Sequence, residues 1–128
     1  MQIFTSYFGN MKQLEKADIV PIGIAIKPPR FFKGVSLKNL APRYEMIHWP
    51  EDRYTPEFKK ILKYQDAKLV YNQLESSAGG KNIALLCYEK PGEFCHRRLV
   101  AEWIEKELNI KVDEFVKKDE RVREQSLF

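Results

Sequence analysis

The feature that most constrains the fold is an apolar run followed, after a Pro-Gly turn, by an amphipathic helical pattern. The run "NIALLCY" (82–88) is short, almost wholly apolar and bounded by Gly-Gly-Lys and Lys-Pro-Gly, which predicts a buried strand. From about Phe94 to Leu108 apolar residues recur at helical spacing, which predicts an amphipathic helix with Asn109 at its C-cap. A strand without polar alternation is covered on both faces, so the pattern favours a parallel sheet flanked by helices.

Three further strands are predicted from the same kind of evidence. Residues 2–8, "QIFTSYF", alternate and are rich in aromatic and β-branched side chains. Residues 19–26, "IVPIGIAI", form a continuous apolar run in which Pro21 and Gly23 indicate a bulge or an irregular ladder. Residues 110–116, "IKVDEFV", alternate again. Because these strands alternate with helical segments, we expect an α/β domain with a mainly parallel sheet.

The helices between these strands carry start and stop signals. A short helical or turn segment is expected at 11–18. Thr55-Pro56 predicts a helix start, with threonine at the N-cap and proline at the first helical position. Asp66 can cap a second helix, which ends at the Gly pair 79–80. The apolar face of that second helix is expected to hold Leu69, Val70 and Leu74.

Composition restricts the class of protein. The chain has 128 residues, of which 44% are hydrophobic and 31% charged, as in ordinary globular domains. The longest apolar stretch is far too short for a membrane span, and the start lacks a signal-peptide pattern. Two cysteines do not make a secreted disulfide framework. We therefore expect a cytoplasmic protein without a membrane partner.

Positive charge is concentrated in residues 27–64, where Lys and Arg exceed Asp and Glu by five. Between positions 31 and 54 this segment holds six aromatic or imidazole side chains, and its long connection at 35–54 is either functional or contains short helices. Basic residues between aromatic ones suit phosphate contact and base stacking. The alternative interpretation is a solvated region whose aromatic side chains cover the core. Those six residues are Phe31, Phe32, Tyr44, His48, Trp49 and Tyr54.

Chemistry-bearing residues gather at the predicted strand–helix junction. Cys87 is expected at the carboxyl end of a central strand, and Cys95 at the amino end of the next helix. Both can face the crevice that open parallel sheets form beyond their strand ends. Arg97 and Arg98 add positive charge to the dipole of that helix end, so an anion is the ligand that such a place binds best.

Four interpretations of this cluster stay open. In the first, Arg97 and backbone N–H groups hold a phosphate. In the second, Cys95 beside His96 is a reactive thiol with a depressed pKa. In the third, His96 is a hydrogen-bonded histidine at the core edge and the cysteines are packed hydrophobes. In the fourth, Cys87, Cys95 and His96 bind zinc. We rank zinc last and expect no metal, because adjacent Cys and His rarely chelate one tetrahedral ion and no CxxC pair is present.

Two short motifs resemble those of domain-of-unknown-function family 488. In that family an apolar strand ends in Leu-Cys-x-Glu and a Cys-His-Arg opens the next helix. Here these are 86–89, "LCYE", and 95–97, "CHR", and the opening "TSYFGN" is similar as well. The resemblance covers about residues 1–116 as a single domain and leaves 117–128 as a charged tail. It implies a small three-layer α/β domain, Rossmann-like in outline, with a polar cluster at the strand ends, and it implies no activity.

Many members carry an Asp-Val-Arg-like motif on the second strand, where this chain has "IVPIGIAIKPPRFF" (19–32). Any activity that depends on that aspartate is therefore not implied for this chain. We expect Lys27 and Arg30 to supply positive charge from the same edge instead.

The function expected from the sequence is binding of a phosphate-bearing ligand, a nucleotide or a nucleic-acid end. Cys95 or His96 is the best candidate for thiol- or histidine-assisted chemistry. The alternative is a non-catalytic binding or adaptor protein, for example one that sequesters a nucleotide signal, with a structural Cys-His-Arg cluster. The alternative role of Glu89 is an ion pair with Arg97 or Arg98. The sequence specifies no cofactor and no oligomeric state. The residues expected to contact or line the ligand are Tyr7, Lys27, Arg30, Cys87, Glu89, Arg97 and Arg98, with Phe31 or Trp49 as a stacking surface.

Overall fold

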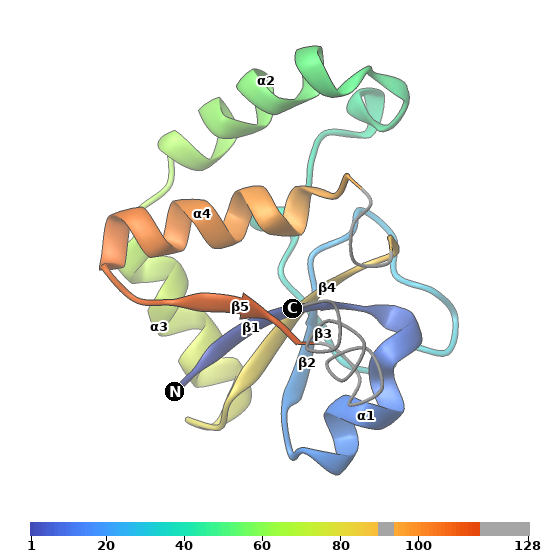
Figure 1. Ribbon diagram of the computed structural model, residues 1–128, viewed down its shortest axis with the longest axis vertical. Coiled ribbons are helices and arrows are strands. Elements are labelled where there is room, and N and C mark those ends of the chain that lie inside the picture. The colour runs from blue at the N-terminus through green and yellow to red at the C-terminus, as the bar shows by residue number, and fades with distance from the viewer. Residues whose placement is uncertain (90–93, 116–128) are drawn as a thin grey trace, which may run out of the picture.

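A computed structural model describes residues 1–89 and 94–115 and shows five parallel strands in one sheet (Figure 1). The strand order is β3-β2-β4-β1-β5, and every pairing is parallel. The predicted α/β class and parallel sheet are therefore confirmed. The strands are β1 (Ile3–Tyr7), β2 (Val20–Gly23), β3 (Val35–Ser36), β4 (Ile83–Cys87) and β5 (Val112–Glu114).

Helices cover both faces of the sheet. One face carries α1, and the other carries α3 and α4, with α2 packed against the outer side of α4 (Figure 1). Short 3₁₀ turns lie at Phe8–Asn10, Lys38–Leu40 and Tyr44–His48. The helices are α1 (Met11–Lys16), α2 (Glu51–Lys63), α3 (Ala67–Ala78) and α4 (His96–Leu108).

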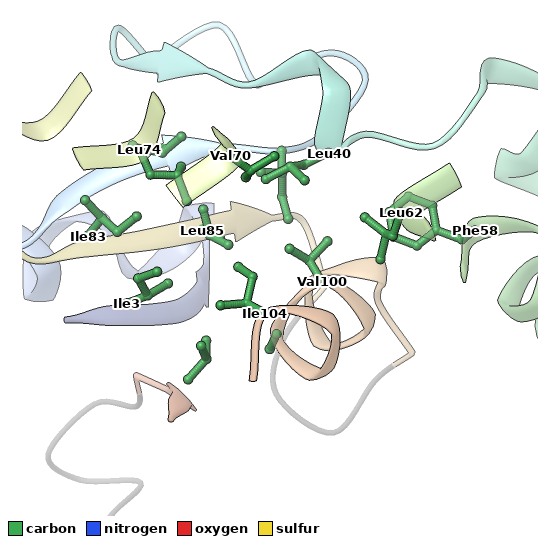
Figure 2. Packing of buried hydrophobic residues seen from close by; sticks show 14 of the residues in the cluster. Ile3, Leu40, Phe58, Leu62, Val70, Leu74, Ile83, Leu85, Val100 and Ile104 are labelled. Carbon is green, nitrogen blue, oxygen red and sulfur yellow. The ribbon is translucent and has the colours of Figure 1, made fainter. Parts of the chain in front are cut away.

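Strand β4 divides the core into its two halves. Ile83 and Leu85 point to the face under α3 and α4 (Figure 2), and the alternate residues Ala84 and Leu86 pack with Phe8 and the α1 side. All five residues of β4 are buried, as its apolar sequence predicted. Burying one such leucine stabilises the fold by about 1.5–3 kcal/mol.

Local capping predictions are confirmed at three places. The Asp66 side chain accepts hydrogen bonds from the backbone N–H groups of Lys68 and Leu69, at 3.0 and 3.3 Å. Gly79 ends α3 with φ of 60°, and Asn109 ends α4 with φ of 54°. These left-handed positions suit glycine and asparagine, which explains the choice of both residues.

The predicted start of α2 was wrong. The helix begins at Glu51 after Pro50 rather than at Thr55, so Pro56 lies inside it. The extra turn buries Tyr54 beside Phe58, and this burial offsets the backbone hydrogen bond that Pro56 cannot donate. The long connection before α2 contains the short turns that the sequence left open.

Two other details differ from prediction. β2 pairs one to one with β4 from Val20 to Gly23, so the expected bulge is absent within these described residues, and the strand ends three residues early. Leu69 is 61% exposed, because the buried face of α3 runs through Val70 and Leu74 instead. The charged tail at 117–128 lies outside the described residues. Within the described part of the chain, no helix has the length and apolarity that crossing a membrane requires.

The connections leave neighbouring strands in opposite directions. From β1 the chain passes through α1 to β2, whereas from β4 it passes through α4 to β5, on the other side of β1. The carboxyl ends of β1, β2 and β4 meet at this reversal of strand order. In open α/β sheets, ligands bind in the crevice beyond such a point.

Candidate functional site

A pocket of about 350 Å³ opens beyond the carboxyl ends of β2 and β4. Its walls come from the segment after β2, the end of β4, the start of α4, and the connection that leads into α2. The lining residues are Ala25, Ile26, Lys27, Pro42, Tyr44, Ile47, Trp49, Tyr54, Cys87, Tyr88, Glu89, Phe94, Cys95 and His96.

The two cysteines of the chain meet in this wall as a disulfide between Cys87 and Cys95. Their Cα atoms are 7.2 Å apart, and both residues are buried. Cys87 ends β4, and Cys95 is the N-cap residue of α4, so the bond links a strand end to the following helix start. The expectation that both thiols face one crevice is met, in the bonded form.

His96 is held in one orientation by the backbone that follows β2. Its Nε2 lies 2.6 Å from the carbonyl oxygen of Ile24, and since a carbonyl only accepts, Nε2 carries a proton. The other ring nitrogen, Nδ1, lies 3.9 Å from Cys95 Sγ. The Phe58 ring packs edge-on at 5.4 Å. The neutral imidazole therefore presents the Nδ1 lone pair to the sulfurs.

Burial lowers the pKa of His96 to about 4. The hydrogen bond to Ile24 opposes this shift, and the positive charge of Arg97 adds to it. At neutral pH the ring is therefore uncharged, so it offers the site a proton acceptor or metal ligand rather than a positive charge.

The structure removes one objection to zinc. The backbone at Cys95 is extended, with φ of −151° and ψ of 142°, and the helix begins at the next residue. This change of direction lets the adjacent side chains of Cys95 and His96 converge. Cys87, Cys95 and His96 each offer a ligand atom within 4.8 Å of the others.

Arg97 is buried and bound on every side of its guanidinium group. Its Nε and Nη2 donate to the two carboxylate oxygens of Glu114, at 3.0 and 2.9 Å. Its Nη1 donates to Cys87 Sγ at 3.1 Å and to the carbonyl oxygen of Glu89 at 2.5 Å. Arg97 is only 1% exposed and does not line the pocket, so it positions the end of β4 from behind.

Arg98 also points away from the pocket. Its Nη1 donates to Thr5 Oγ1 at 2.7 Å, and that hydroxyl donates in turn to Glu114 at 2.6 Å. Weaker contacts at 3.4 Å join Arg98 to the carbonyl oxygen of Val112. The two arginines thus fasten α4 to β1 and β5 through one carboxylate.

Charged and polar groups do reach the pocket from other residues. Lys27 and Glu89 both line it, and the Tyr88 hydroxyl donates to the carbonyl oxygen of Lys27 at 2.5 Å. This bond ties the segments after β2 and β4 together. Burial, and then the nearby Glu89 carboxylate, raises the pKa of Tyr54, so this phenol stays protonated as a donor.

Aromatic rings form much of the outer wall. Tyr54 meets the Phe94 ring edge-on at 5.2 Å. The Arg53 guanidinium lies 3.8 Å from the centre of the Trp49 ring. Tyr44 lines the rim and is 78% exposed. A pocket with such walls suits a flat ring system.

Five of the nine predicted site residues line this pocket. They are Lys27, Cys87, Glu89, Cys95 and His96. The other four lie elsewhere: Tyr7 is buried, Arg30 is exposed, and Arg97 and Arg98 pair with the sheet, as described above. Of the two stacking candidates, Trp49 lines the pocket and Phe31 does not.

Sequence reasoning left other pocket residues out. Tyr44 and Tyr54 lie in the segment 27–64, where basic and aromatic residues are interleaved. That composition was the signal that could have marked them as pocket residues. Tyr88 and Phe94 flank the two cysteines, yet nothing in the sequence marked them as wall residues. Glu114 had no signal, because its partner Arg97 is 17 residues away along the chain.

Comparison with known proteins places the chain in a family. A family model described as DUF488-N3a, the active DUF488-N3 subclade, matches residues 5–108. None of the curated proteins and none of the solved structures compared with the chain gives a match. The match spans most of the chain, including both cysteine motifs. The chain therefore belongs to the DUF488 family, in its DUF488-N3a subclade.

Proposed function

We propose that this protein binds a phosphate-bearing ligand, a nucleotide or a nucleic-acid end, in the pocket beyond β2 and β4. The observation that carries the proposal is the composition of that pocket, which combines aromatic side chains with Lys27 and the start of α4. Its volume of about 350 Å³ lies in the range of small-molecule sites.

The aromatic wall accounts for the ring of such a ligand. Trp49 and Tyr44 lie on the connection before α2, and Phe94 lies just before α4. Stacking of a base on one aromatic side chain contributes about 1–3 kcal/mol and tolerates any base. The wall supports binding of a planar group without specifying which base it is.

Lys27 and the amino end of α4 account for the anionic group. The first turn of α4 presents backbone N–H groups and the positive end of the helix dipole, and Cys95 and His96 of that turn line the pocket. Glu89 on the same wall can accept a hydrogen bond from a hydroxyl of the ligand. In this proposal Arg97 supports the wall rather than touching the phosphate.

Chemistry at the site would require the reduced cysteine pair. Reduction would free the Cys95 thiol, whose sulfur lies 3.9 Å from Nδ1 of His96, as the candidate nucleophile. The description of the subclade as active supports keeping this step in the proposal.

The second candidate function is binding without turnover. It is favoured by the disulfide and by the fixed groups around it, since His96 is bound to Ile24 and Arg97 to Glu114. The reactivity of the Cys95 thiol distinguishes the two candidate functions. A catalytic Cys95 in the reduced protein alkylates fast near neutral pH, and a packed one reacts only on unfolding.

Isothermal titration calorimetry with a panel of nucleosides and their 5′-mono-, di- and triphosphates tests the binding proposal. We expect the phosphorylated members to bind at least about tenfold more tightly than the matching nucleosides, because a charge-assisted contact contributes about 1.5–3 kcal/mol. Lys27→Ala should remove most of this difference and leave nucleoside binding unchanged. Lys68→Ala, on the exposed outer side of α3, is the matched control. Equal affinity for nucleosides and nucleotides would contradict the proposal.

A further inference from the structure

The pocket wall contains three potential metal ligands, which come from two segments of the chain. Cys87 ends β4, and Cys95 and His96 begin α4. Their ligand atoms lie within 4.8 Å of one another, and all three residues are buried. Two sulfurs and one imidazole nitrogen form the donor set that zinc prefers.

The orientation of His96 is the orientation of a ligating histidine. In metal sites the ring nitrogen that does not bind the ion typically donates to a carbonyl or carboxylate, which fixes the tautomer. Here Nε2 donates to Ile24 at 2.6 Å and leaves the Nδ1 lone pair toward the sulfurs. Nδ1 is 3.9 Å from Cys95 Sγ. Nitrogen and sulfur ligands of one tetrahedral zinc are about 3.5 Å apart, given bonds of about 2.0 and 2.3 Å, so only a small shift is needed.

The cysteine backbones also leave room for an ion. The Cα atoms of Cys87 and Cys95 are 7.2 Å apart. This separation is wider than the ~4.4–6.8 Å that is usual for a disulfide. Two thiolates on one zinc have sulfurs about 3.8 Å apart, a separation that these cysteines can adopt only after the disulfide is reduced.

The net charge of the three potential ligands balances the charge of a zinc ion. Two thiolates and a neutral imidazole cancel the charge of Zn²⁺ without a further anion. Arg97 Nη1 donates to Cys87 Sγ at 3.1 Å, which is the kind of outer contact that stabilises a ligating thiolate. The Glu114 carboxylate holds Arg97 in that place.

We propose that the dithiol form of this protein binds one Zn²⁺ through Cys87 Sγ, Cys95 Sγ and His96 Nδ1. All three residues line the pocket, so the fourth position of the ion faces the pocket and is open to water or a ligand oxygen. Sites with three protein ligands and one open position are typical of zinc used in catalysis rather than in structure. The inference does not rest on the proposed nucleotide binding.

The disulfide and the metal exclude each other. A small dithiol such as dithiothreitol reduces the bond: two electrons and two protons pass to Cys87 and Cys95, and the reagent closes to its own disulfide. The thiol protons then leave as Zn²⁺ binds. The same residues thus form a metal site under reducing conditions and a covalent bridge under oxidising ones.

Cobalt titration tests the site with the metal alone. The full chain is reduced, freed of dithiothreitol without oxygen and titrated with Co²⁺, then with Zn²⁺ as competitor. We expect a thiolate-to-cobalt charge-transfer band and visible bands of four-coordinate cobalt, saturating at one equivalent. The disulfide form should show neither.

Variants identify the ligands. Cys87→Ser, Cys95→Ser and His96→Gln should each weaken Zn²⁺ binding by roughly 100-fold or more, at or beyond the loss typical of an outer-shell contact. The chain has two histidines, so His48→Gln at the exposed second one is the matched control and should bind like the unaltered protein. Unchanged binding by folded Cys87 and His96 variants would overturn the proposal.

A second measurement covers variants that fail to fold. In the unaltered reduced protein, one equivalent of Zn²⁺ should slow iodoacetamide alkylation of both cysteines by about tenfold or more, measured by mass spectrometry of the peptides, since metal-bound thiolates are shielded. Equal rates with and without zinc, or no cobalt charge-transfer band at one equivalent, would overturn the proposal.

Discussion

His96 Nε2 lies 2.6 Å from the carbonyl oxygen of Ile24, so the first residue of α4 is bound to the backbone that leaves β2. This contact joins two walls of the pocket and fixes which ring nitrogen carries the proton. The pocket chemistry therefore depends on a strand end and a helix start that are 72 residues apart in the chain.

The buried imidazole predicts a pH dependence of stability in the disulfide form. The pKa of His96 is lowered from 6.5 to about 4 in the folded protein. Between these values the unfolded chain binds a proton that the native protein does not. The free energy of unfolding should therefore rise with pH across this window, and fall by roughly 3 kcal/mol as pH drops from 6.5 to 4. Urea unfolding at each pH measures this change.

Two controls separate this effect from general acid denaturation. His96→Gln should flatten the dependence, and His48→Gln at the exposed histidine should leave it unchanged. NMR titration of the folded protein reads the imidazole directly. A His96 midpoint near 6.5 would contradict the account.

Removing one partner of the buried ion pair between Arg97 and Glu114 should lower the free energy of unfolding strongly. Their side chains are 2% and 17% exposed, and Glu114→Ala leaves the guanidinium buried without its carboxylate. We expect a loss of about 3 kcal/mol in the free energy of unfolding. Lys81→Ala, which breaks the exposed pair with Asp18, should cost less than about 1 kcal/mol. Similar losses of unfolding free energy in both variants would show that the buried ion pair contributes no more to stability than the exposed one.

The N-cap of α3 predicts a smaller effect. Asp66 accepts from two backbone N–H groups, so Asp66→Ala should lower the free energy of unfolding by about 1 kcal/mol. Asp66→Asn keeps an acceptor oxygen and should restore most of this loss. Chemical denaturation of the three proteins measures the difference. An asparagine variant as unstable as the alanine one would argue against the cap.

The disulfide predicts a redox-dependent stability. Cys87 and Cys95 are eight residues apart, and closing so short a loop contributes about 2.5 kcal/mol in the chain-entropy account. Adding a metal-free reductant should lower the free energy of unfolding by up to that amount. The double variant Cys87→Ser/Cys95→Ser should not respond to the reductant. A response in the double variant would place the redox effect elsewhere.

Local sequence pattern was sufficient for the parts of the fold that local forces decide. The apolar run of β4 and the caps at Asp66, Gly79 and Asn109 depend on neighbouring residues, and all were predicted. The positions of Cys87 and Cys95 followed as well, because a strand end and the next helix start lie at the same edge of a parallel sheet.

The remaining features depend on tertiary packing. Helix α2 begins at Glu51 and not at the predicted Thr55, because burial of Tyr54 outweighs the preference for proline in the first turn. The partner of Arg97 could not be read from the sequence, because Glu114 becomes its neighbour only after β5 pairs with β1. For the same reason the guanidinium of Arg97, which the sequence suggested as a ligand for an anion, lies behind the pocket wall.

Tryptophan fluorescence tests the central claim, ligand binding in this pocket, most directly. The chain has two tryptophans: Trp49 lines the pocket, and Trp103 lies in a separate groove between α2 and α4. In Trp103→Phe, nucleotides should change the remaining Trp49 emission in a saturable way, and matching nucleosides should need higher concentrations. In Trp49→Phe, the same nucleotides should leave the Trp103 emission unchanged. No change in the Trp103→Phe protein at millimolar nucleotide, or equal changes in both variants, would contradict the account.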